Sequence, residues 1–136
     1  RFIYPYEEAS GYSTNDFVMR AIMYFGYAPD TIQTDNGGEF CNTQKTNKIH
    51  TFDRLCTKLH IYHKTIRPRT PWHNGKVERS HRNDQERFYN YLKFYSYDDL
   101  LLQMKRYLKR SNNIPMAVLG WKSPLEKRKE LENSCV

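Results

Sequence analysis

The chain has 136 residues, a length that predicts a single globular domain with one hydrophobic core. Its 22 Lys and Arg against 15 Asp and Glu leave a formal charge of +7, which favours a polyanionic partner such as nucleic acid over a merely soluble basic surface. No apolar run approaches the ~20 residues of a membrane span, and the first residues lack the layout of a signal peptide. The three cysteines show no paired spacing, which argues against a disulfide framework. We therefore expect a cytoplasmic protein.

Residues 1–8 (RFIYPYEE) are aromatic and partly alternating, a pattern that predicts a strand. Pro5 places this strand at a sheet edge or at an irregularity, because proline cannot donate to a ladder. Ser13, with Asp16 three positions later, is typical of a helix start, and Gly26 ends the helix. The apolar residues of this helix recur at helical spacing, so we expect it to face the core.

Residues 31–34 (TIQT) have the β-branched alternation of a short strand, and Asp35 follows directly. We expect Asn36, Gly37 and Gly38 to end the strand, because they accept the positive φ of tight turns. An ordinary turn is the alternative interpretation of such a triplet. A carboxylate at a strand end is also a common metal ligand, so Asp35 is a candidate for that role.

After this turn, the residue pattern predicts a solvent loop over residues 41–48, an amphipathic helix over 50–60 and a strand over 61–66. The apolar positions of the helix follow one face and are Phe52, Leu55, Cys56 and Leu59. Cys56, His60 and His63 lie close enough in sequence to suggest zinc, but we favour a core position for Cys56. The strand-helix-strand order predicts that the two strands are parallel neighbours.

Residues 67–75 carry two prolines and a glycine and predict an exposed loop. The helix that follows is expected to reach residue 92, with Val77, Phe88, Tyr91 and Leu92 facing inward and Glu78 in its first turn. A glutamate at a helix N-terminus is favoured by the helix dipole alone, so a non-catalytic Glu78 is the alternative.

Between residues 58 and 87 there are eight Lys and Arg against three acidic residues, a net charge of +5 around Glu78. The residues that we expect to contact DNA are Asn74, Lys76, Arg79, Arg82, Gln85 and Arg87. A solvated charged helix face is the alternative. Two more helices are predicted, one after Ser96 and one opened by a capping box at Ser123 and Glu126 that runs to about residue 132.

Two ordered motifs connect these elements: TDNGGEF at residues 34–40 and PRTPWHNGKVER at residues 68–79. Together with FDRLC at 52–56, IYH at 61–63 and LGWKSP at 119–124, they resemble the catalytic core of DDE transposases and retroviral-type integrases, in the branch of bacterial insertion sequences. The 42 residues between Asp35 and Glu78 exceed the spacing in the shortest family members, which an insertion in the surface loop explains at little entropic cost.

The resemblance implies an α/β fold of the RNase H-like class with strand order 3-2-1-4-5. Residues 1–120 would form the core from its third strand onward, and 121–136 a C-terminal helical tail, so we expect an incomplete sheet and a chain truncated at its N-terminus. The family uses three carboxylates, of which Asp35 and Glu78 match two. Asp16 and Asp30 do not match the position of the third.

By the same resemblance, Asp35 and Glu78 are the expected catalytic and metal-binding residues, with Mg²⁺ or Mn²⁺ as cofactor. The expected reaction is phosphodiester cleavage and strand transfer on transposon ends and target DNA, by a homo-oligomer when complete, in the bacterial cytoplasm. We expect this chain alone to be inactive, because the first catalytic Asp is absent. A non-enzymatic DNA-binding remnant is the main alternative, and an RNase H-type nuclease, which lacks the N-G-x-V-E-R signature, is another.

Overall fold

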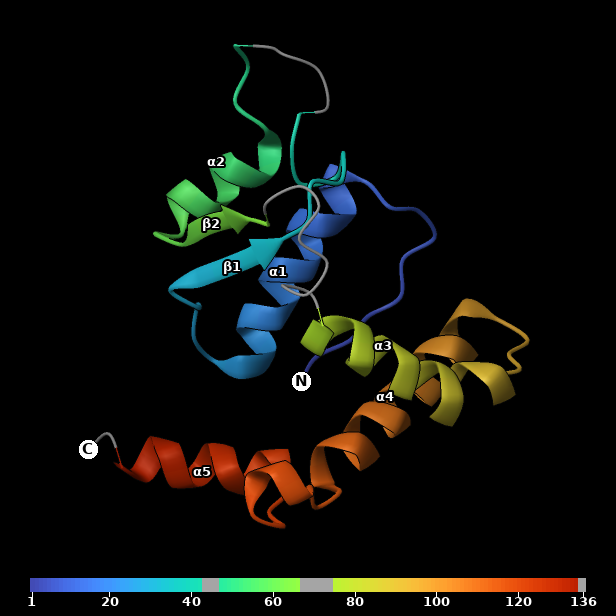
Figure 1. Ribbon diagram of the computed structural model, residues 1–136. Coiled ribbons are helices and arrows are strands. Elements are labelled where there is room, and N and C mark those ends of the chain that lie inside the picture. The colour runs from blue at the N-terminus through green and yellow to red at the C-terminus, as the bar shows by residue number, and fades with distance from the viewer. Residues whose placement is uncertain (43–46, 67–74, 135–136) are drawn as a thin grey trace. The chain divides into compact units, whose positions relative to one another are not determined.

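The computed structural model describes residues 1–42, 47–66 and 75–134 (Figure 1). The chain divides into two compact units, one formed by Tyr6–Asp84 and the other by Arg1–Pro5 together with Gln85–Val136. None of the helices in the described part is long and apolar enough to cross a membrane.

The unit Tyr6–Asp84 is built around a parallel pair of strands, β1 (Thr31–Thr34) and β2 (Tyr62–Thr65), as the sequence predicted. Their register pairs Thr31 with Tyr62 and Thr34 with Thr65. Helix α1 (Gly11–Phe25) precedes β1, and α2 (Thr51–Lys58) connects the strands and packs against α1 (Figure 1). The two helices approach closely at Gly11, where an added Cβ would lie 2.9 Å from Thr51 Oγ1.

The core of this unit lies between the helices and the sheet. Its buried residues are Val18, Phe52, Cys56 and Ile61, and the partly buried residues packed on them are Ile22, Ile32, Phe40, Leu55 and Leu59. The apolar face predicted for residues 50–60 is therefore confirmed, and so is the core position of Cys56. Burial raises the pKa of the Cys56 thiol, which disfavours the thiolate that zinc binding requires.

The second unit contains α4 (Tyr97–Asn113) and α5 (Pro124–Ser134), with single 3₁₀ turns η2 (Tyr89–Tyr91) and η3 (Ala117–Leu119). Ser96 caps α4 by accepting a hydrogen bond from the Asp99 amide at 3.1 Å. At the start of α5, the Ser123 amide donates to Glu126 Oε2 at 2.7 Å and the Glu126 amide donates to Ser123 Oγ at 3.3 Å. Both predicted helix starts are therefore confirmed.

Residues 1–8 do not form the predicted strand. The Phe2 and Tyr4 rings stack at 6.5 Å, as alternate side chains of an extended chain do, but no strand in the described residues pairs with this segment. The contacts of Arg1 are instead with α4, where Asn112 Nδ2 donates to the Arg1 carbonyl at 2.9 Å and the Arg1 guanidinium lies 5.3 Å from the Tyr107 ring centre. An extended sequence becomes a strand only with a partner ladder.

Three local predictions also differ from the structure. Helix α1 begins earlier than expected, because Ser10 rather than Ser13 is its cap, accepting the Ser13 amide at 3.2 Å. The turn after Asp35 uses no positive φ, since the glycines with positive φ in the described chain are Gly26 and Gly120. The third difference concerns the helix that carries Glu78.

Helix α3 (Gly75–Arg87) ends five residues before the predicted position. Phe88 leaves the helical conformation, and its ring stacks on Tyr107 with centroids 4.4 Å apart and planes 6° from parallel. Because the helix has ended, its spacing no longer places Tyr91 inward, and this side chain is 78% exposed. Val77, also predicted inward, is 50% exposed.

Candidate active site

Asp35 is an exposed carboxylate at the carboxyl end of β1, directly after the buried Thr34. Its Oδ1 atom accepts a hydrogen bond from the Gly37 amide at 2.9 Å, which closes a turn of the Asx type. The amides of Phe40 and Cys41 both donate to the Gly37 carbonyl at 3.0 Å. The chain after β1 is therefore folded back on itself, and the Asp35 carboxylate is part of the turn.

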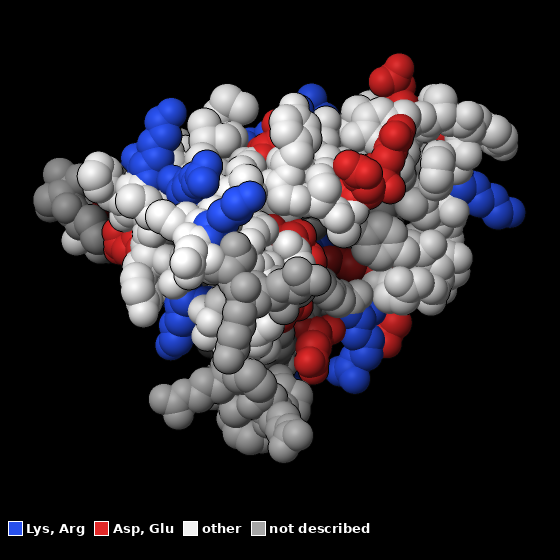
Figure 2. All heavy atoms as spheres, turned by 90° about the horizontal axis from the view of Figure 1, so that it is seen from above, with Lys and Arg blue, Asp and Glu red and all other residues white. Residues whose placement is uncertain are grey.

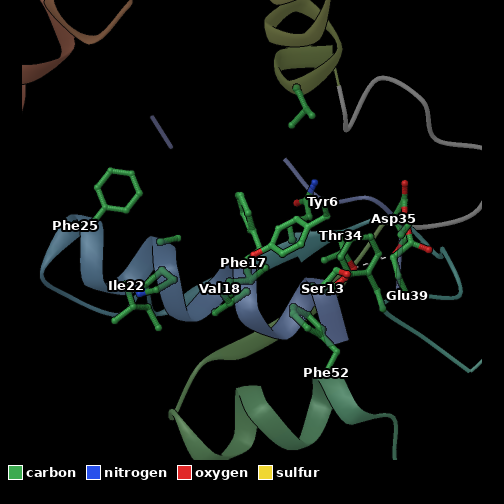
Figure 3. Close-up of a pocket in the computed structure, with 18 of the residues that line it drawn as sticks. Tyr6, Ser13, Phe17, Val18, Ile22, Phe25, Thr34, Asp35, Glu39 and Phe52 are labelled. Atoms are coloured by element: carbon green, nitrogen blue, oxygen red, sulfur yellow. Dashed lines mark hydrogen bonds between the residues drawn. The ribbon is translucent and has the colours of Figure 1, made fainter. Parts of the chain in front are cut away.

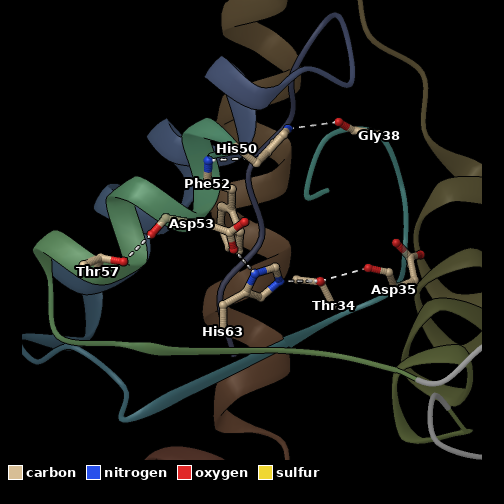
Figure 4. A network of polar contacts seen from close by, with 8 residues as sticks. All are labelled: Thr34, Asp35, Gly38, His50, Phe52, Asp53, Thr57 and His63. Atoms are coloured by element: carbon tan, nitrogen blue, oxygen red, sulfur yellow. Dashed lines mark hydrogen bonds and ion pairs between the residues drawn. The ribbon is translucent and has the colours of Figure 1, made fainter. Parts of the chain in front are cut away.

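Two further hydrogen bonds attach this turn to the rest of the unit. Asn36 Nδ2 donates to the Ile66 carbonyl, just beyond β2, at 3.0 Å. His50 Nδ1 accepts the Phe52 amide at 3.2 Å as the cap of α2, so its proton is on Nε2, which donates to the Gly38 carbonyl at 3.2 Å (Figure 4). The turn is thus held from both the strand and the helix that follow it.

A cavity of about 760 Å³ lies beside this turn (Figure 3). Asp35 and Glu39 line it from the turn, and Val77 and His81 line it from α3. Much of the remaining lining is apolar and comes from α1. Glu78 lies next to Val77 in the exposed first turn of α3 but does not line the cavity. The helix that carries Glu78 therefore lines the same cavity as Asp35. A short distance between the two carboxylates stays a prediction.

The donors available for a metal ion here are carboxylates. Among the residues that the structure describes, no group of three or more Asp, Glu, His or Cys is arranged to hold an ion. Asp35 and Glu78 are both exposed and carry the oxygen ligands that Mg²⁺ and Mn²⁺ prefer, so their chemistry fits such an ion. Glu39 was not predicted as a site residue. Its carboxylate occupies the space beside Gly37, within 2.5 Å of where a Cβ would stand.

The basic side chains of α3 are exposed. Arg79, Arg82 and Arg87 form no ion pair with another residue of the described part. Gln85 is also exposed, and its Nε2 donates to Asn90 Oδ1 at 2.6 Å. Lys76 belongs to α3, and Asn74 lies outside the described residues. Figure 2 shows both basic and acidic side chains exposed on the face drawn there.

The other acids and the zinc alternative can be placed as well. The Asp16 carboxylate accepts hydrogen bonds from the Tyr6 hydroxyl and the Arg20 guanidinium, which in that order lower its pKa. Asp30 lies in the bend before β1, at its opposite end from Asp35. His63 does not join Cys56 in a metal site, because its ring is bound to Asp53 and Thr34.

Sequence reasoning predicted Asp35 as a site residue but did not predict this histidine network or the cavity-lining His81. The spacing of Val77 and His81 on one helix face could have identified His81. No local signal marks the network, because its contacts join residues 10 and 29 positions apart.

Comparison with known proteins gives concordant matches. Residues 59–124 match the family model described as the integrase core domain, a range that includes Glu78 but not Asp35. The chain is 33% identical over 108 residues to "Putative integrase ORF3" of Spiroplasma virus SpV1-C74, a match that covers 73% of this chain and 28% of that protein. The chain therefore spans under a third of the length of this curated relative.

Two solved structures share the fold at 24% identity. One is the catalytic core domain of BIV integrase, with a TM-score of 0.62 over 98% of this chain and 78% of that chain. The other is a chain of the simian T-cell lymphotropic virus intasome in complex with the PP2A regulatory subunit B56 gamma, with a TM-score of 0.58 over 73% of this chain and 34% of that chain.

Proposed function

Because this chain carries an integrase core domain with an RNase H-like fold, we propose that it acts in DNA integration as part of a transposase or integrase. The observation that carries the proposal is the exposed Asp35 carboxylate at the end of a parallel strand, lining one cavity with side chains of α3. Ligand sites at the carboxyl ends of parallel strands are a general feature of α/β sheets. The reaction would be phosphodiester cleavage and strand transfer.

Asp35 and Glu78 are the proposed ligands of Mg²⁺ or Mn²⁺. When bound, such an ion polarises the phosphodiester and stabilises charge on the attacking and leaving oxygens. Asp35 would contribute from the turn after β1. This turn is restrained by hydrogen bonds that involve Gly37, Ile66 and His50. Glu78 would contribute from the first turn of α3.

The proposed partner is DNA, both transposon ends and target. Arg79, Arg82 and Arg87 are exposed on the helix that carries Glu78 and are suited to phosphate contacts. Asn74, Lys76 and Gln85 belong to the same footprint on sequence grounds. Pairing of two DNA ends would require a homo-oligomer, and the site of action would be the bacterial cytoplasm, where the DNA lies.

We further propose that residues 1–136 supply two of the three carboxylates that such a reaction uses. The support is the motif resemblance, in which Asp35 and Glu78 match two of the three carboxylates of the family. A polypeptide of these residues alone would then bind DNA without joining strands, because misplaced or missing catalytic groups cost about a hundredfold or more in rate.

The metal assignment is tested by Mn²⁺ titration of the chain, followed by paramagnetic broadening of amide resonances. Asp35→Asn and Glu78→Gln should each abolish broadening near the cavity. The matched controls are Asp30→Asn, at the other end of β1, and Glu86→Gln, two turns along α3, and both should leave it unchanged. Equal effects of test and control variants would contradict the assignment. Metal-dependent strand transfer by residues 1–136 alone would contradict the proposed division of ligands.

A further inference from the structure

A buried histidine lies behind the turn that presents Asp35. We propose that Asp53, His63 and Thr34 form a hydrogen-bonded relay that positions Asp35. These are positioning residues, because their contacts lead to Asp35 and they are not themselves among the proposed ligands. The inference rests on the proposed function in one respect, the role of Asp35 as a ligand.

The relay crosses three elements. His63 Nδ1 lies 2.6 Å from Asp53 Oδ1 on α2, and His63 Nε2 lies 2.8 Å from Thr34 Oγ1 on β1. Thr34 Oγ1 in turn donates to the backbone carbonyl of Asp35 at 2.9 Å (Figure 4). His63 is the register partner of Ile32, so the two-residue period of a strand puts Thr34 on the same face of the sheet as the imidazole.

The chemistry of the groups fixes one end of this chain of contacts. A carboxylate can only accept, so His63 Nδ1 carries a proton and donates it to Asp53 Oδ1. At the other end, His63 Nε2 and Thr34 Oγ1 share a hydrogen bond, and the same Thr34 oxygen contacts the Asp35 carbonyl. The histidine therefore joins the carboxylate on α2 to the backbone that carries Asp35.

The ring has little freedom to turn. The His63 side chain is 8% exposed, and the Phe52 ring meets it edge to face with centroids 4.7 Å apart. Phe52 is itself 1% exposed, so the core determines the plane of the imidazole. A buried imidazole with both ring nitrogens hydrogen-bonded is satisfied, whereas removal of either partner would leave a buried polar nitrogen without one.

The far end of the relay is the peptide group that follows Asp35. Thr34 holds the carbonyl of this peptide, and the Gly37 amide holds the Asp35 carboxylate, so the backbone and side chain of Asp35 are restrained from opposite ends. Groups that orient a metal ligand in this way affect metal affinity by about 10–100-fold when removed. A histidine that only joined α2 to the sheet would affect stability but not the affinity of the folded protein.

The first test is the tautomer of the wild-type ring, which needs no variant to fold. In ¹⁵N-histidine NMR, His63, assigned by loss of its signals in His63→Gln, should show a protonated Nδ1, as its contact with Asp53 requires. His50 is an internal reference, because its hydrogen bonds leave Nδ1 unprotonated. An unprotonated Nδ1 in His63 would overturn the relay.

The second test separates positioning from stability. Thr34→Val removes the hydroxyl with little change in shape, and Thr34→Ser keeps it. Mn²⁺ affinity at the turn, read from broadening of the Gly37 amide in folded protein, should fall about tenfold in Thr34→Val and be retained in Thr34→Ser. Urea unfolding of the same samples measures stability independently.

The result for Asp35→Asn distinguishes failure of the relay from failure of the proposed function. Loss of Mn²⁺ binding in Asp35→Asn with unchanged affinity in Thr34→Val overturns the relay alone. Wild-type affinity in Asp35→Asn overturns the metal assignment and, with it, the role of the relay.

Discussion

The basic face of α3 makes a quantitative prediction about DNA binding. Arg79→Ala together with Arg82→Ala removes two exposed cations from the helix that carries Glu78, neither of them in an ion pair within the described chain. Each phosphate contact contributes about 0.9 to the slope of log K against log salt, so the double variant should reduce that slope by about 2. The loss of affinity should be largest at low salt and similar for all duplex sequences.

The assay is fluorescence anisotropy with a labelled duplex at several salt concentrations. The matched control is Lys127→Ala with Arg128→Ala on α5, which removes the same charge from residues already paired with Glu130 and Glu132. This control should keep most of the wild-type slope. An unchanged slope in the α3 variant would refute the footprint, and equal reductions in both variants would mean that net charge alone governs binding.

Three further predictions concern the core, the last helix and the metal ligands. Phe52→Ala, at a side chain 1% exposed, should lower the free energy of unfolding by about 3–5 kcal/mol in urea titration, and a change under 1 kcal/mol would contradict its central place in the core. Backbone and side-chain hydrogen bonds from Ser123 lower the pKa of Glu126 below its ordinary value of 4.5. The stabilising effect of the Glu126 carboxylate should therefore be complete above pH 4.5 and be lost as the pH falls through the lowered pKa. The midpoint of thermal unfolding of Glu126→Gln should lack this pH dependence. In a crystal grown with Mn²⁺, the Asp35 and Glu78 carboxylates should lie roughly 4–8 Å apart, and a separation beyond about 12 Å would mean that they belong to different sites.

Much of the unit Tyr6–Asp84 follows from local sequence patterns. The β-branched run before Asp35 becomes β1, and the apolar stripe around Phe52 becomes the buried face of α2. The capping box at Ser123 likewise starts α5 where expected. These features are predictable because caps, turns and the periodicity of a helix depend on residues within a few positions of one another.

The predictions that failed concern features that depend on contacts between residues far apart in the sequence. Residues 1–8 have the composition of a strand, but a strand exists only where another strand offers a ladder, and the described chain offers none to this segment. The end of α3 is decided by Phe88 stacking on Tyr107, a residue 19 positions away. Apolar spacing alone cannot say which partner an aromatic ring will choose.

For the candidate site, the sequence by itself predicts Asp35 and Glu78, because the motifs around them are contiguous and resemble one family. The tertiary structure alone shows what surrounds Asp35. His63 reads as an ordinary strand residue or as a zinc ligand until folding brings it between Asp53 and Thr34. The physical reason is distance along the chain: a carboxylate at a strand end is a local property, whereas the groups that restrain it come from a neighbouring strand and helix that meet only when the core between them is packed.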